Sequence, residues 1–130
     1  MNILWSCFPK FFQSYSLEQL AALAREVELD TLNVVIREGY AVAPDTLAED
    51  LPRYVSRMRE LGLDTSFATT GFHPKHLIAD ESILAAFGDS GVTEVRLSYY
   101  GINPSVPLSD QIDRARRQLA ETAEQCERHG

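Results

Sequence analysis

The sequence predicts an α/β protein made of four consecutive βα units with a parallel sheet, which is half of a (βα)8 TIM barrel. Strand-like segments recur about every thirty residues, and a helical pattern follows each of them. Polar residues also alternate with apolar ones inside two of the strands. The 130 residues of the chain are close to half of the roughly 250 that are typical of this barrel. We therefore expect residues 1–130 to be a single (βα)4 unit, the N-terminal half of a barrel whose remainder is absent.

The predicted strands are short and contain many β-branched residues. They cover residues 2–7, 31–36, 65–70 and 94–99. A strand followed by a helix, repeated four times, requires right-handed crossovers between parallel strands. An open doubly wound sheet shares this pattern, but it usually has a glycine-rich turn after the first strand, and "SCFPKFF" has none. The half barrel is therefore preferred.

Two capping boxes predict where the first two helices begin. Ser16 with Gln19 forms the first, and Thr46 with Glu49 forms the second. Pro52 lies too deep for the first turn of a helix capped by Thr46. We therefore expect either a short turn before Pro52 and a new helix from it, or a kink.

Glycine and serine mark the other helix ends. Gly62 is predicted to be a left-handed cap that ends the second helix. A short third helix is expected over residues 80–87, ending at Gly88, and the fourth begins after Pro107 with Ser109 as its cap. The buried side of the fourth helix is predicted to comprise Ile112, Ala115, Leu119, Ala123 and Cys126.

Composition excludes several classes of function. The net charge is −7 and the twelve Lys and Arg residues are scattered, which argues against a nucleic-acid surface because phosphate neutralisation needs clustered cations. No apolar stretch predicts export or a membrane span. Cys7 and Cys126 are far apart in sequence, so a reduced, cytoplasmic protein fits best, with Cys7 as a small apolar strand residue. A local arginine pocket for a small phosphorylated substrate remains compatible with this charge.

The second strand is apolar on one face and polar on the other. Because side chains alternate along a strand, Val34 and Ile36 are predicted to face the helices, while Asn33 and Arg37 point into the barrel. Arg37 then lies at the C-terminal mouth, where active sites of this fold occur. The fourth strand repeats the division and turns Arg96 inward.

The two inward arginines are candidate substrate-binding residues. Arg37 is interpreted either as a ligand of an oxyanion or phosphate, or as the ion-pair partner of Glu94. Arg96 lies deeper and has a more structural character, although its inward direction keeps it among the candidates.

Histidine and aromatic residues complete the candidate site. His73 and His76 flank Pro74 after the third strand, but two histidines without a third ligand are a weak metal signal, so contact of His73 with substrate is preferred. Trp5 and Tyr100 are candidate walls for a sugar ring, with core packing as the alternative for each. No metal ligands are assigned.

The segment "VVIREGYAVAPDTLAEDLPRYVSRMRELGL" resembles the second βα unit of the sugar phosphate isomerase/epimerase group with a xylose isomerase-like TIM barrel. "VTEVRLSYYG", followed by a long helix, is similar to the fourth unit of the same group. The resemblance covers most of the chain. One departure is that Tyr40 and Ala41 stand where members of the group often carry a Gly-His pair, which leaves the role of that histidine vacant.

The resemblance implies a metal-dependent isomerase or epimerase that transfers a proton next to a carbonyl of a sugar-like substrate. In the full-length family a divalent metal (Mn, Mg, Zn or Co) is held by residues of later strands, beyond Gly130, so this chain alone is expected to bind none. Its catalytic residues remain unknown.

Two functions from different classes follow. The first is part of such an enzyme, with a small sugar-like substrate. The second is a non-catalytic (βα)4 assembly module that closes a barrel by dimerising or by pairing with another chain, because a four-stranded parallel piece leaves two unpaired edges. We expect a homo-oligomer or a missing C-terminal half, and no partner among nucleic acids or membranes.

Overall fold

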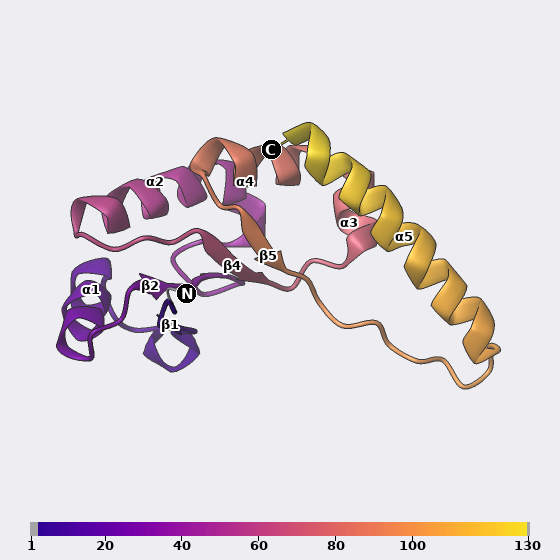
Figure 1. The fold of residues 1–130 in the computed structure, drawn as a ribbon, viewed down its shortest axis with the longest axis horizontal. Helices are drawn as coiled ribbons and strands as arrows, with labels where there is room; N and C mark the ends of the chain where they lie inside the picture. Colours follow the sequence, from indigo (N-terminus) through magenta and orange to yellow (C-terminus); the bar gives the residue numbers. More distant parts are fainter. Residues whose placement is uncertain (1–2, 130) are drawn as a thin grey trace.

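The structure is a computed structural model that describes residues 3–129. Helices and short strands alternate along this part of the chain (Figure 1). The strands are β1 (Ser6–Cys7), β2 (Thr31–Leu32), β3 (Val34–Ile36), β4 (Phe67–Thr70) and β5 (Glu94–Arg96). The α-helices are α1 (Leu17–Glu26), α2 (Leu47–Glu60), α3 (Pro74–Ala79), α4 (Ser82–Ser90) and α5 (Leu108–His129). The 3₁₀ turns η1 (Lys10–Phe12) and η2 (Pro44–Thr46) precede α1 and α2.

All strand pairs are parallel. β1 pairs with β2, and β3, β4 and β5 form a second sheet in which Val34 lies opposite Ala68 and Ala68 lies opposite Val95. The predicted α/β class with parallel strands is therefore confirmed. The strands are arranged, however, in two small sheets of two and three strands, not in one run of four.

The predicted strand over residues 31–36 is broken at Asn33. Its first part pairs with β1 and its second part with β4. The side chain of Asn33 accepts a hydrogen bond from Ser6 Oγ (2.8 Å), and its backbone N–H donates to Cys7 O (3.0 Å). The residue thus lies where the chain exchanges one strand partner for another, which explains why one predicted strand becomes two.

The core lies between the helices and one face of the strands. Val34 and Ile36 are fully buried in the same cluster as Leu51 of α2. Asn33 lies on the other face, where it lines an open hollow of about 290 Å³ together with Phe67 and other residues. The predicted apolar face of the second strand is confirmed at Val34 and Ile36. Val35, which by alternation shares the face of Asn33, is buried and lines a hollow with Leu20 of α1 and Tyr54 of α2, so the opposite face is not polar throughout.

One of the two predicted capping boxes forms. Gln19 N–H donates to Ser16 Oγ (3.2 Å), and Ser16 N–H donates to Gln19 Oε1 (2.8 Å). The box of Thr46 and Glu49 is wrong, because η2 runs directly into α2 and Thr46 is not in the extended conformation that a cap requires. Its hydroxyl donates to the Asp50 carboxylate instead.

Two expectations for α2 have different outcomes. The helix begins at Leu47 and continues through Pro52, so the alternative of a new helix starting at Pro52 is wrong. Gly62 has a φ of +83°, and the predicted left-handed cap is confirmed.

The predicted helix over residues 80–87 is found as α4, and the short helix α3 that precedes it was not predicted. The left-handed cap is Gly91, with a φ of +80°, and not Gly88, which lies inside α4. A Cβ atom on Gly88 would lie 2.4 Å from the carbonyl oxygen of His129. This glycine therefore permits the close approach of α4 and α5 and does not end a helix.

The predicted buried stripe of α5 is wrong. Thr122 and Gln125 are its buried residues, whereas Ile112 and Leu119 are 42% and 48% exposed. The helix also begins at Leu108, one residue before the predicted cap Ser109. Figure 1 shows that the C-terminal half of α5 packs beside α3 and α4, while its N-terminal half extends away from the sheets. The apolar stripe therefore lacks a covering surface over much of its length.

Candidate functional site

Three predicted site residues lie near the carboxyl ends of the strands. Arg37 directly follows β3, His73 follows β4 by three residues, and Tyr100 follows β5 by four. Trp5 precedes β1, so it lies at the opposite edge. Its backbone N–H donates to the Asp30 carboxylate (2.7 Å) and its side chain is largely exposed. The structure thus places Arg37, His73 and Tyr100 at the predicted edge and leaves Trp5 away from it.

The side chains of His73 and Tyr100 are in direct contact. Their ring centroids are 4.4 Å apart and the rings meet edge to face at 76°, a favourable geometry for aromatic pairs. The Tyr100 hydroxyl donates to Ala115 O of α5 (3.5 Å). The backbone N–H of His73 donates to Nδ1 of His76 (3.1 Å). Contacts from α3 and α5 therefore position both residues.

The environment keeps both rings uncharged at neutral pH. Burial lowers the pKa of His73 below its usual value, and the positive charge of Lys75 acts in the same direction. Burial raises the pKa of Tyr100. The Nδ1 atom of His73 is buried and has no hydrogen-bond partner among the described residues. A neutral imidazole can donate one hydrogen bond and accept another, but a ligand could reach Nδ1 only if the atom became exposed.

Arg96 pairs with an aromatic side chain near this edge. Its guanidinium lies 4.9 Å from the centroid of the Tyr99 ring and contacts the Tyr99 hydroxyl. The arrangement is a cation–π contact, which restricts the guanidinium without neutralising its charge. Tyr99 was missed by sequence reasoning; the available signal was its position three residues after Arg96, next to Tyr100.

Arg37 is half-buried, and its backbone N–H donates to Val42 O (3.1 Å). No hydrogen bond or ion pair of its side chain is found within residues 3–129, so the alternative role as ion-pair partner of Glu94 gains no support. No hydrogen bond joins Arg37 to His73 in this part of the chain either. That the two residues project into one cavity stays a prediction.

The described residues do not fit a divalent metal ion. Among residues 3–129, no three His, Cys, Asp or Glu side chains are grouped so that they could hold one. The rings of His73 and His76 are 6.4 Å apart, and Nδ1 of His76 already accepts a hydrogen bond. The metal that the resemblance implies would need ligands from elsewhere, and we derive no step from it.

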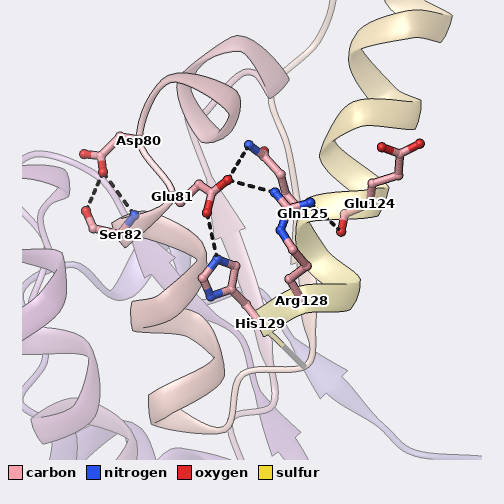
Figure 2. Close-up of polar contacts among 7 residues, drawn as sticks. All are labelled: Asp80, Glu81, Ser82, Glu124, Gln125, Arg128 and His129. Carbon is pink, nitrogen blue, oxygen red and sulfur yellow. Dashed lines mark hydrogen bonds and ion pairs between the residues drawn. The ribbon is translucent and has the colours of Figure 1, made fainter.

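A cluster around Glu81 holds the C-terminal end of α5 (Figure 2). Glu81 Oε1 accepts hydrogen bonds from Arg128 Nη2 (2.8 Å) and Gln125 Nε2 (3.2 Å). His129 Nε2 lies 3.5 Å from the other carboxylate oxygen. No sequence signal links Glu81 to residues so far along the chain.

Replacing Glu81 by glutamine is expected to loosen the end of α5. Hydrogen bonds from Arg128 and His129 lower the pKa of Glu81, so its stabilising effect is present above the ordinary value of 4.5 and is lost as the pH falls below it. Hydrogen exchange should show acid-sensitive protection of the last turns of α5 in the wild type. Glu81→Gln should have lower protection at neutral pH and little acid sensitivity.

Glu124→Gln is the matched control for this experiment. Glu124 lies on the same helix, but the described residues include no ion-pair partner for its carboxylate (Figure 2). This variant should keep the wild-type profile. Identical protection factors in the wild type and Glu81→Gln at every pH would show that the cluster does not hold α5.

Comparison of the chain with models of protein families, with curated proteins and with solved structures finds no match. Within residues 3–129, no helix has the length and apolar character needed to cross a membrane. The class that the structure defines is an α/β protein with parallel strands. The residues near the carboxyl ends of the strands, which we call the carboxyl edge, are the ones from which we infer its function.

Proposed function

We propose that the carboxyl edge of the strands binds a small sugar-like hydroxy-carbonyl compound. In this proposal the chain is the N-terminal half of a (βα)8 barrel and part of an isomerase or epimerase of the sugar phosphate group. The observation that carries it is the His73 and Tyr100 pair, in which an imidazole and a phenol ring meet edge to face at the carboxyl ends of the strands. Active sites of parallel α/β folds lie at this edge.

The chemistry of a sugar matches these groups. An aromatic ring offers an apolar surface to the C–H face of a sugar, while neutral His73 exchanges hydrogen bonds with a hydroxyl or carbonyl oxygen. The guanidinium groups of Arg37 and Arg96 are suited to a phosphate substituent. Isomerisation moves a proton at the carbon next to a carbonyl. We assign that proton transfer to none of the described residues, since the family's metal and carboxylate ligands would come from elsewhere.

Replacing His73 by phenylalanine is expected to weaken sugar binding about fivefold, because the ring contact with Tyr100 remains while the hydrogen bond, worth roughly 1 kcal/mol, is lost. Titration of the chain with a panel of ketoses, aldoses and their phosphates, followed by NMR, measures this. Backbone shifts should centre on residues near positions 73 and 100.

His129→Gln provides the control, because His129 belongs to the Glu81 cluster at the other end of α5. It should bind the same sugars with the affinity of the wild type. Binding that is equal in His73→Phe, or shifts that centre on another surface, would contradict the proposed site.

A second function is favoured by the unpaired strands. Among the described residues, β1 and β5 each have one strand partner, as do β2 and β3, which in addition carry the isolated bridges of Thr31 with Asp64 and of Ile36 with Val42. The face of the strands away from the helices forms the open hollow of about 290 Å³, lined by apolar Leu4 and Phe67 as well as by Asn33 and Glu94. A module that closes a barrel with another copy or chain would cover both the edges and this face.

Light scattering on the purified chain tests the assembly function. A mass of twice the 14.6 kDa of one chain would support it. A stable monomer with a sharp unfolding transition would contradict it, because such a protein would have no need to cover its edges.

A further inference from the structure

The strongly exposed large apolar side chains are confined to the two ends of the molecule. Six lie within residues 3–27 and five within residues 99–119 of the described chain, and none lies between. Figure 1 shows β1 and α1 at one end and α5 at the other. Apolar patches of this kind mark interaction surfaces when they are contiguous with unpaired strands.

Each apolar patch adjoins one of the free sheet edges. Leu4 and Trp5, which are 68% and 66% exposed, directly precede β1. Tyr99 follows β5, and Ile112 and Leu119 form the uncovered stripe of α5. The patches are therefore part of two composite surfaces, one made by β1 with its flanking residues and the other by β5 with α5.

We propose that the β5 and α5 surface of one chain binds the β1 surface of a second copy, and that a two-fold axis repeats this contact to close a ring. The inference rests on the assembly function proposed above and names its partner. A strand that extends the sheet as a parallel partner of β5 must run in the same direction as β5. β1 of a second copy can take this position, and the strand faces that point away from the helices in the two copies then face each other inside the ring.

A second copy is the occupant that satisfies both surfaces at once. The two surfaces differ, so neither is covered by a copy of itself, and a head-to-tail contact is required. Two chains in a ring pair the free edges of β1 and β5 in both copies, whereas a single unrelated strand would pair only one of them. Phe11 and Tyr15, which follow β1 and are exposed, would join His73 and Tyr100 of the other copy around one mouth. The second copy would thereby complete the candidate site.

The test uses two variants that each disable one surface of the full chain. Leu4→Glu places a charge in the β1 surface, and Ile112→Glu places one in the α5 surface. Both positions are exposed, so the fold of a single chain should survive, as circular dichroism will show. If either variant fails to fold, Trp5→Glu and Leu119→Glu replace them at the same two surfaces.

Sedimentation velocity should give a dimer for the wild type and a monomer for each variant alone, since every contact in a variant ring contains one charged surface. An equimolar mixture of the two variants should regain a dimer, because one contact then joins two unaltered surfaces. A wild-type dimer whose variants stay monomeric when mixed would overturn the head-to-tail contact and leave the assembly function standing. A monomeric wild type would overturn both the head-to-tail contact and the assembly function.

Discussion

Replacing Val34 by aspartate is expected to remove much of the stability of the fold. Val34 is fully buried in the core between the strands and the helices. A carboxylate there would lose its hydration without gaining a partner, which costs about 4 kcal/mol or more. A domain of this size is stabilised by only about 5–15 kcal/mol. Circular dichroism and the soluble yield of the variant measure the loss.

Asn33→Asp is the matched control, because it adds the same side chain to the adjacent position of the same strand segment. Asn33 is half-buried on the opposite face, and its Oδ1 atom accepts a hydrogen bond from Ser6 that an aspartate preserves. Its cost should stay below about 1 kcal/mol. Similar losses of stability in the two variants would mean that Val34 does not face the core or that Asn33 does not face the open hollow.

This contrast also shows what was predictable from the sequence. Side chains alternate along any strand, so the order of Asn33, Val34, Val35 and Ile36 is sufficient to assign the two faces. The break at Asn33 was not predictable in the same way. It depends on which neighbour pairs with each half of the segment, and pairing between distant residues leaves no local pattern.

The apolar stripe of α5 was recognised correctly as a stripe but was wrongly assigned to the core. Helical periodicity reveals which residues share a face, not which surface meets that face. In the structure, Arg128 and Gln125 donate hydrogen bonds to Glu81. These bonds fix the rotation of α5, so that Thr122 and Gln125 are its buried residues. The exposed stripe is instead part of the surface that we propose binds a second copy of the chain.

The candidate site was predictable where it depends on strand order. Residues that follow parallel strands share one edge, and this rule places His73 and Tyr100 together without any knowledge of their contacts. Trp5, predicted with Tyr100 as a candidate wall for a sugar ring, precedes β1 and therefore lies at the opposite ends of the strands. The free Nδ1 atom of His73 arises from packing and hydrogen bonding, and the sequence contains no signal for it.

Replacing Leu51 by alanine is expected to reduce the free energy of unfolding by about 2–5 kcal/mol. Leu51 lies on α2 and is fully buried beside Val34 and Ile36, so the smaller side chain leaves a cavity in a packed core. Urea unfolding measures the change. Leu119→Ala removes the same atoms from a side chain that is 48% exposed on α5, and its cost should be less than about 1 kcal/mol in the monomer.

The size of the Leu51 effect distinguishes two states of the isolated chain. If the helices pack against the strands in one fixed arrangement, Leu51→Ala lowers the urea midpoint sharply and Leu119→Ala does not. If the core forms only when the open face is covered, the monomer is loosely packed, its transition is broad, and both leucines contribute little. In that case the large Leu51 effect should appear at chain concentrations at which the protein dimerises, because assembly and core packing are then a single transition.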